Sequence, residues 1–505
     1  MLAASSACGL APGERFGRAG ARRGVLRVHV PAPVIEWDPP RAHEGLERFV
    51  ALQLFATLLD DEGRPRLAQS VRDDDGGGTV VVTLDAAARF SDGVAIDAGA
   101  VVWSWRRALL RSTGAADLAP FSAIANGQAL AEGRLLRVAR STTGRTAPYA
   151  SLGDAPDAAP ALELAAGTMV RVVDTNERRP CCGGSVALRR EPNHGDALGA
   201  LNVNDVGAII GARTVKGSRF LLLRTSSGAS GWAEERTLAM QVPPASLLRV
   251  VDRGDGSAAL RVGPEDDAPA RVPLADGEVV EVLGEAEGFL QAVDLRTGQM
   301  GFVARRALEA LRGEQQWLEV EPVGVGPPAP ARAWVPLRDL AFDPSALGVR
   351  AIDAVTIEIE CASEPASVLR ALAHPALAPV PPHAIASRGR AWIDAAAIVT
   401  TGPFAPATST SERLVLVRSS TSVELERARL ERVELVAVDD MIAALHLYRA
   451  GELDVLLALP ADLAPALARA QDHAPSAGGG GLIAPEVRGL SLDRLDLRGV
   501  EVVPP

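Results

Sequence analysis

The spacing of apolar and polar residues predicts short strands and helices in the first part of the chain. Leu26, Val28 and Val30 alternate with the polar residues Arg27 and His29, which is the period of a half-buried strand. The pattern predicts a further strand over residues 79–84 and helices over 44–59 and 98–110. A similar mixture returns over residues 336–470, so we expect an α/β fold.

Residues 161–312 follow a different pattern, with short β-like runs separated by Gly and Asp turns. One motif occurs twice in this stretch: a Leu-Arg start precedes a β run, and a Gly-aromatic pair closes the copy. The two copies start at Leu188-Arg189 and Leu260-Arg261, and they close at Gly231-Trp232 and Gly301-Phe302. Both copies resemble bacterial SH3-like domains, which implies two small β-barrels over 161–240 and 246–312.

The closing aromatic residues of the two copies, Trp232 and Phe302, are candidate contact residues for a partner. Large aromatic side chains contribute much of the energy of protein interfaces. Packing inside each barrel explains them equally well, so both interpretations stay open.

Composition divides the rest of the chain. The Ser/Thr/Gly/Pro-rich stretches at 137–160 and 313–335 are typical of linkers, and the run at 471–484 of a flexible glycine joint. The domains that we expect are a leader or tether at 1–24, an α/β lobe in two parts at 25–136 and 336–470, the two barrels, and a C-terminal return segment of the lobe at 485–505.

Charge and residue content exclude several classes of protein. The chain has 52 basic and 63 acidic residues, a net charge of −11, and its one dense basic run lies at 15–23. Nucleic-acid binding needs clustered basic residues on a folded face, so we do not expect it. Apolar residues make up 47% of the chain but aromatic residues only 4%. Ala, Leu and Val must therefore form the cores.

The sequence carries no recognised catalytic or metal-binding motif. It lacks GxSxG, HExxH and a P-loop, and its histidines are scattered. Cys181 and Cys182 are adjacent, which does not suit a disulfide, and Cys361 lies in a strand-like run. We therefore expect neither catalysis nor a metal or other cofactor.

The N-terminus resembles the end of a lipoprotein signal, in which small residues precede an acylated Cys. Residues 1–7 are small or apolar and Cys8 follows them, which makes Cys8 the candidate lipidation site. No apolar stretch approaches the ~20 residues that span a bilayer. We expect an extracytoplasmic protein, periplasmic or anchored to a membrane through this lipid alone.

Several short motifs in the α/β parts occur in the order found in extracellular solute-binding proteins of family 5, the oligopeptide-binding type. The most specific stretch is Phe90-Ser91-Asp92-Gly93-Val94 followed by the helix that contains Trp103 and Trp105. The other stretches that carry the resemblance are 36–39, 67–71, 347–353, 374–381, 401–404 and 448–455.

This resemblance implies a periplasmic-binding-protein type II lobe that is interrupted by the two barrels. Val34, Trp37, Thr401 and Gly402 stand at positions where the family faces its ligand. After Gly451-Glu452-Leu453-Asp454 only about 50 residues follow, where the family has a second lobe of about 200, so we expect that lobe to be missing.

The resemblance also implies the function. We expect non-covalent binding of a peptide or peptide-like solute for delivery to the permease of an ABC transporter. The alternative is an envelope protein that no longer serves transport and uses its SH3-like domains to bind peptidoglycan or a protein.

Overall fold

The computed structural model describes residues 24–456 with short gaps, and these described residues divide into two units. The gaps are residues 35, 43–44, 74–77, 146–159, 176, 182–184, 203–204, 226–227, 241–244, 287, 311–316, 324–331 and 423–429. The first unit, called the lobe, is formed mainly by residues up to Ala125 and from Gly348 onward. The second, called the β unit, is formed mainly by residues Asn126–Leu347. The leader, the glycine joint and the return segment lie outside the described residues.

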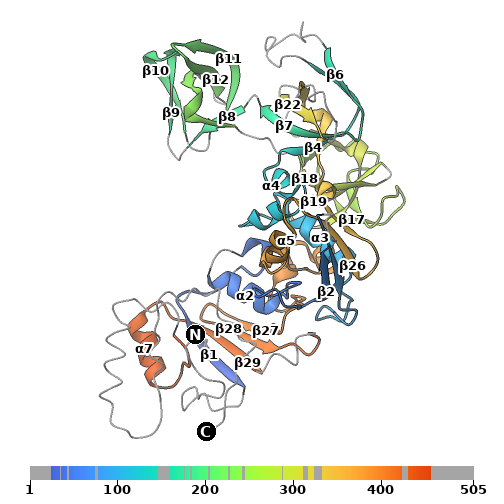
Figure 1. The fold of residues 1–505 in the computed structure, drawn as a ribbon, viewed down its shortest axis with the longest axis vertical. Coiled ribbons are helices and arrows are strands. Elements are labelled where there is room, and N and C mark those ends of the chain that lie inside the picture. Colours follow the sequence, from blue (N-terminus) through green and yellow to red (C-terminus); the bar gives the residue numbers. More distant parts are fainter. Residues whose placement is uncertain are drawn as a thin grey trace. The chain divides into compact units, whose positions relative to one another are not determined.

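One four-stranded sheet of the lobe contains the first predicted strand (Figure 1). Its order is β1-β29-β28-β27, and β1 runs parallel to β29 with Val28 opposite Leu435. Leu26, Val28 and Val30 are buried as predicted, but His29 is fully buried too, because its Nε2 lies 3.0 Å from the carbonyl oxygen of Val438. The strands are β1 (Val25–Val30), β27 (Phe404–Ser409), β28 (Arg413–Arg418) and β29 (Arg432–Ala437).

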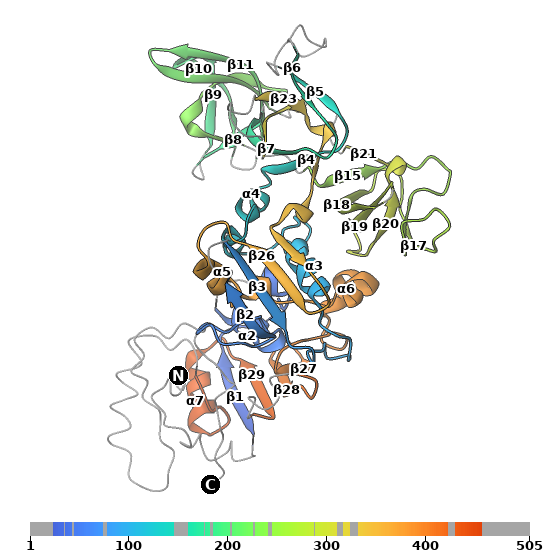
Figure 2. The same cartoon turned by 45° about the vertical axis from the view of Figure 1, so that its right-hand side comes forward.

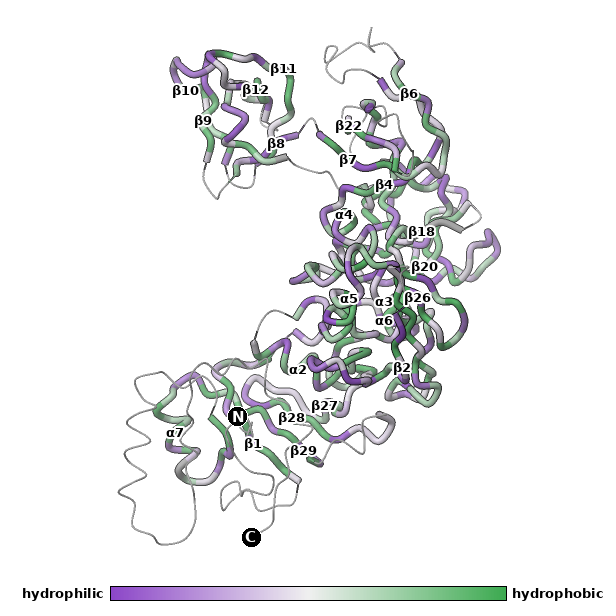
Figure 3. Tube along the Cα trace, in the orientation of Figure 1, coloured by the Kyte–Doolittle hydropathy of each residue, from purple (hydrophilic) through white to green (hydrophobic). Residues whose placement is uncertain are grey.

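A second four-stranded sheet of the lobe, with the order β2-β3-β26-β25, is antiparallel throughout. Apolar residues recur along its strands, as they do along β1 and β29 (Figure 3). Its strands are β2 (Ala68–Asp73), β3 (Thr79–Leu84), β25 (Val349–Ala351) and β26 (Thr356–Glu360).

The two helices predicted in the first part of the lobe are present as α2 (Leu46–Leu54) and α3 (Ala98–Ala108), although residues 55–59 of the first prediction are not helical and Phe55 is extended. Asp97 begins α3, because its carboxylate accepts a hydrogen bond from the amide of Ala100. Trp105 of α3 is fully buried, and its indole N–H donates to the carbonyl of Leu377 at 2.7 Å. Trp103 is only partly buried. The other described α-helices of the lobe are α5 (Pro365–Ala371), α6 (Pro382–Arg388) and α7 (Met441–Arg449), while α4 (Gly127–Ala131) belongs to the β unit.

The β unit contains two seven-stranded sheets of identical topology, one for each predicted repeat (Figure 2). We call them module 1 (177–240) and module 2 (247–310). Module 1 has the order β10-β9-β13-β12-β11-β8-β14, and module 2 has the equivalent order β17-β16-β20-β19-β18-β15-β21. Module 1 consists of β8 (Glu177–Pro180), β9 (Val186–Glu191), β10 (His194–Leu201), β11 (Gly207–Val215), β12 (Ser218–Thr225), β13 (Ser230–Glu234) and β14 (Leu238–Met240). Module 2 consists of β15 (Leu247–Val250), β16 (Ala259–Arg261), β17 (Ala270–Pro273), β18 (Val279–Ala286), β19 (Phe289–Asp294), β20 (Met300–Ala304) and β21 (Leu308–Ala310).

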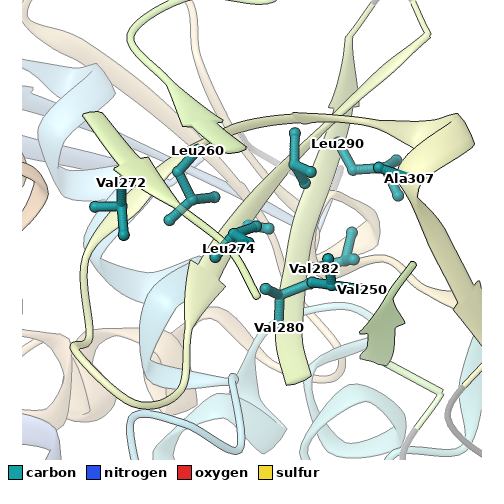
Figure 4. Close-up of a cluster of buried hydrophobic side chains, with 10 residues drawn as sticks. Val250, Leu260, Val272, Leu274, Val280, Val282, Leu290 and Ala307 are labelled. Carbon is teal, nitrogen blue, oxygen red and sulfur yellow. The ribbon is translucent and has the colours of Figure 1, made fainter. Parts of the chain in front are cut away.

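The core of module 2 consists of small aliphatic side chains (Figure 4). It contains Val, Leu and Ala and no aromatic residue, which agrees with the low aromatic content of the chain. Its fully buried members include Val250, Leu260, Val280, Ala292 and Val303. Leu188, Leu201, Leu221 and Leu223 occupy the core of module 1 in the same way.

A third sheet of the same topology is formed by two segments, one that precedes module 1 in the sequence and one that follows module 2. We call it the split module (135–175 and 317–342). Its order β24-β4-β7-β22-β23-β5-β6 matches that of module 1 when read from the other end. Modules 1 and 2 are therefore inserted between β7 and β22, the equivalents of β11 and β12. Its strands are β4 (Leu135–Val138), β5 (Thr142–Arg145), β6 (Pro160–Leu164), β7 (Met169–Thr175), β22 (Trp317–Pro322), β23 (Ala333–Pro336) and β24 (Leu340–Phe342).

The split module corrects two expectations from the sequence. Parts of the predicted linkers at 137–160 and 313–335 are strands of this sheet, and strands within residues 161–175, which we assigned to the first barrel, also belong to it. The physical reason is that β7 pairs with β22, with Thr175 opposite Leu318. The periodicity of either segment alone does not show a pairing between strands that are so far apart in the sequence.

The register of the strand pairings confirms that the three modules are equivalent. In each, an aromatic residue pairs with an Arg of the neighbouring strand: Trp232 with Arg189, Phe302 with Arg261, and Trp334 with Arg145. Each module also has a one-residue irregularity at the same place in the longest hairpin. A short 3-10 helix precedes the last strand of each, at Glu235–Thr237, Arg305–Ala307 and Leu337–Asp339.

Candidate binding sites

Thr401 and Gly402, two of the four predicted ligand-facing residues, hold the end of α2. Both amides donate to the carbonyl of Leu54, at 3.0 and 2.8 Å, and the Thr401 hydroxyl accepts a hydrogen bond from the amide of Ala56 at 2.9 Å. Thr401 is 2% exposed, and a Cβ on Gly402 would overlap the carbonyl of Gln53. Gly402 is thus required for close backbone packing. Both residues belong to the interior of the lobe.

Val34 and Trp37, the other two predicted residues, are also buried. The Trp37 indole donates to the carbonyl of Val34 at 3.2 Å, and the two side chains are 5% and 7% exposed. The next residue, Asp38, accepts two hydrogen bonds from Arg107 at 3.1 and 2.6 Å. The Arg107 guanidinium lies 5.6 Å from the ring centre of Trp392, a cation–π arrangement. A ligand-binding role for the four residues stays a prediction.

The most specific family stretch and the segment before β27 are joined by hydrogen bonds. The amide of Ser91 donates to the carbonyl of Thr400 at 2.8 Å, and the Ser91 hydroxyl accepts from the amide of Thr400 at 2.9 Å. Gly93 has a φ of +88°, as the tight turn requires. The Asp92 carboxylate lies 2.6 Å from Nε2 of His383. The turn therefore fixes the position of Thr400, the residue that precedes Thr401 and Gly402.

His374, which lies in another of the family stretches, is a mostly buried titratable group of the lobe. Its Nε2 lies 3.2 Å from an Arg48 nitrogen and 3.4 Å from an Asp117 oxygen. Burial first, and then the positive charge of Arg48, lower the pKa of His374 to about 4, although Asp117 acts in the opposite direction. The imidazole is therefore neutral at pH 7.

The exposed ends of two parallel strands lie beside the segment that contains Val34. β1 and β29 are parallel neighbours, so their carboxyl ends, Val30 and Ala437, lie at the same edge of the sheet. The three residues after β1 are exposed, and so are Asp439 and Asp440 after β29. In open α/β sheets, ligands bind outside the carboxyl ends of the strands. This edge is the candidate solute site of the lobe.

A groove on module 1 is the second candidate site. It has a volume of about 730 Å³, and its lining includes Trp232, Arg189, Cys181, Phe220, Glu234 and Arg236. Trp232 is partly exposed there. The sequence identified Trp232 but not Arg189 as a contact candidate, although the Leu-Arg start of the repeat contains that arginine. The register between β9 and β13 is the signal that connects the two residues.

Phe302 of module 2 occupies the position equivalent to Trp232, but its surroundings differ. Its partner Arg261 donates to the carbonyls of Ala268 at 2.8 Å and Gly256 at 2.7 Å. The guanidinium is thus held by the loops of its own module.

The cysteines and the described helices indicate no other kind of site. Cys8 and Cys182 lie outside the described residues, and burial raises the pKa of the Cys361 thiol. Within residues 24–456 and their gaps, no group of His, Cys, Asp and Glu is placed to hold a metal ion. Among the helices that the structure describes, none is both long and apolar enough to cross a bilayer.

Comparisons with known proteins assign part of the chain to a family. Residues 318–485 match the model for the middle region of bacterial extracellular solute-binding proteins, family 5. The probable deoxycholate-binding periplasmic protein YgiS of Escherichia coli is 32% identical over 126 residues, 25% of this chain and 23% of that protein. The periplasmic oligopeptide-binding protein OppA of E. coli is 32% identical over 110 residues, 22% of this chain and 20% of that protein.

Solved structures give a more distant likeness. OppA of Burkholderia pseudomallei superimposes with a TM-score of 0.45 at 14% identity, over 89% of this chain and 49% of that one. The chain therefore spans about half the length of that structure, and the sequence matches cover about a fifth of each curated relative.

The α/β lobe contains most of the segment that is similar to solute-binding proteins of the periplasmic-binding-protein class. Residues 318–485 resemble family 5 of the bacterial extracellular solute-binding proteins, the family whose motifs the sequence resembles. This family consists of binding proteins.

Proposed function

We propose that this chain binds a peptide-like solute outside the cytoplasm and serves as the binding component of an ABC transporter. The observation that carries the proposal is the family match over residues 318–485, which includes the Thr401–Gly402 segment. The oligopeptide-binding relative favours a peptide as the solute. The alternative of a non-transport envelope protein has no comparable support.

The solute would bind at the carboxyl ends of β1 and β29. Pro31, Ala32 and Pro33 are exposed there, and they lead directly into buried Val34. Two prolines in three residues restrict this segment, so little conformational entropy is lost when a ligand contacts it. The four predicted residues then act by fixing the segments on which the site is built: Trp37 holds the carbonyl of Val34, and Thr401 holds the end of α2.

A bulky substitution at the exposed segment tests the location. Binding of trialanine and of trilysine to the full chain would be measured by isothermal titration calorimetry. We expect Ala32→Trp to weaken the binding of whichever peptide binds at least tenfold, because the indole occupies the site without entering the core. The matched control is Ala87→Trp, at an exposed turn position of the same lobe, which should leave binding unchanged.

Two outcomes would contradict the proposal. If neither peptide binds but deoxycholate does, the solute is not peptide-like. If a peptide binds equally well to Ala32→Trp and to the wild type, the site is not at this edge of the sheet.

A further inference from the structure

The three equivalent aromatic–arginine pairs of the β unit differ in how accessible they are. In the split module Trp334 is 8% exposed, so this residue is buried. In module 2 the Arg261 guanidinium donates to two loop carbonyls. In module 1 Arg189 is exposed and donates a hydrogen bond to the carbonyl of Gly195 at 3.0 Å, while Trp232 is partly exposed. In module 1 both members of the pair line the groove.

The groove forms where two neighbouring strands separate. Of the six residues of β9, one pairs with β13, namely Arg189 with Trp232. Beyond that pair, Ser185, Val186 and Ala187 of one segment and Ala233 of the other line the groove and are not paired with one another, although Val186 and Ala187 pair with β10 and Ala233 with β12. Main-chain groups of separated strands accept an added extended segment, which is how many proteins bind peptides. The shape therefore suits an extended peptide better than a compact solute.

The charge of the groove is positive although the whole chain is acidic. Glu234 is paired with Arg236, whose Nε lies 2.9 Å from its carboxylate, and this pair lowers the pKa of Glu234. The two charges offset each other, so the charge of Arg189 remains. An exposed guanidinium that lines the same groove as an indole favours a carboxylate next to an apolar group. The positive charge of the groove therefore differs in sign from the net charge of the chain, which is −11.

We propose that the groove around Trp232 and Arg189 of module 1 binds an extended peptide segment that carries a carboxylate. The segment lies between β9 and β13, its carboxylate pairs with Arg189, and an apolar side chain packs on the Trp232 ring. Phe302 and Trp334 are not part of this site. The site is separate from the solute site of the lobe and adds a second ligand to the proposed function.

Three short peptides test the chemistry by calorimetry on the full chain. They are acetyl-Val-Ala-Val-Ala with a free carboxyl end, the same peptide with an amide end, and acetyl-Val-Ala-Glu-Ala-amide. We expect at least one of the two acidic peptides to bind at least tenfold more tightly than the neutral amide. Preference for the first identifies a carboxyl terminus as the ligand group, and preference for the third identifies an acidic side chain.

Matched variants locate the binding. Arg189→Gln should weaken binding of the acidic peptide at least tenfold and abolish its advantage over the neutral amide, while Arg261→Gln, at the equivalent position of module 2, should have no effect. Trp232→Ala should weaken all three peptides. Arg189 is exposed, so its substitution leaves the fold intact, which circular dichroism would verify.

The proposal is overturned if the acidic peptides bind no better than the neutral amide, or if Arg261→Gln weakens binding as much as Arg189→Gln does. The variant Ala32→Trp, which blocks the proposed solute site, distinguishes binding at the groove from binding at the lobe. Binding that is lost in Ala32→Trp but kept in Arg189→Gln belongs to the solute site and contradicts the groove. The reverse pattern supports the groove even where the proposed solute function fails.

Discussion

Arg27 and Asp454 form a two-point ion pair that joins the first strand of the lobe to the segment after its last described helix. Nε and one Nη of Arg27 lie 3.1 and 3.2 Å from the two carboxylate oxygens, and the amide of Arg27 also donates to the same carboxylate at 2.8 Å. The next residue, Val455, bridges to Val28 of β1. Asp454 is the last residue of the family stretch Gly451-Glu452-Leu453-Asp454, so this motif has a structural role.

We expect Asp454→Ala to destabilise the lobe by about 3 kcal/mol, because removing one member of a buried pair leaves the other without compensation. Burial raises the pKa of the Asp454 carboxyl in spite of Arg27. Burial therefore disfavours the charged form of this carboxylate, and Arg27 compensates only in part. Chemical denaturation at pH 7 measures the change in the free energy of unfolding. Asp439→Ala, an exposed carboxylate nearby, is the control and should change stability by less than about 0.5 kcal/mol. Equal effects of the two variants would show that the pair contributes nothing.

His374 should make the stability of the lobe depend on pH. Its pKa in the folded state, about 4, is below the ordinary value of 6.5, so the unfolded chain binds a proton in this range and the folded chain does not. The stabilising contribution is complete above pH 6.5 and is lost as the pH falls toward 4. The slope from this residue approaches about 1.4 kcal/mol per pH unit.

Denaturation midpoints of the wild type and of His374→Gln between pH 7 and pH 4 measure this contribution. The variant should lose the part of the slope that His374 supplies, and His194→Gln, an exposed histidine of module 1, should not. Parallel curves for wild type and His374→Gln would contradict the prediction.

Local periodicity revealed the elements whose partners are near in sequence or whose pattern is regular. The alternation of Leu26, Val28 and Val30 and the Asp97 cap of α3 each carry their own signal. The burial of His29 was not predictable, because the carbonyl of Val438 that contacts it follows β29, which is distant in the sequence. The groove on module 1 was only partly predictable: Trp232 closes a visible repeat, whereas the role of Arg189 depends on register.

The split module did leave one signal in the sequence. Ala333-Trp334-Val335 repeats the closing pattern Gly231-Trp232-Ala233, and a 3-10 helix and a short strand follow both. Its start was hidden, because Gly144 takes the place of the Leu in the Leu-Arg motif and lies against Ala333. In module 1 the sizes are reversed, with Leu188 packed against Gly231. Complementary packing of this kind is visible only in three dimensions.

Modules 1 and 2 should be removable without loss of the split module. Thr175 and Leu318 are opposite each other in an antiparallel pair, as are Val215 and Ser218 of module 1. The latter two are joined by Lys216-Gly217, both with positive φ, which is the two-residue turn that suits a hairpin. Replacing residues 176–317 by Lys-Gly should therefore connect β7 to β22 by an equivalent turn. We expect a soluble protein with a cooperative thermal transition that keeps the solute binding of the lobe and loses binding of the acidic peptide.

A register control makes this test specific to the pairing. Replacing residues 176–318 by Lys-Gly joins the turn to Glu319, which shifts β22 by one residue. Because successive side chains of a strand point to opposite faces, the shift moves fully buried Val320 to the outer face. Thermal unfolding followed by circular dichroism should show a cooperative transition for the first variant and a weaker or absent transition of the split module for the second. If neither deletion folds, the inserted modules are needed to hold the two halves of the split module together.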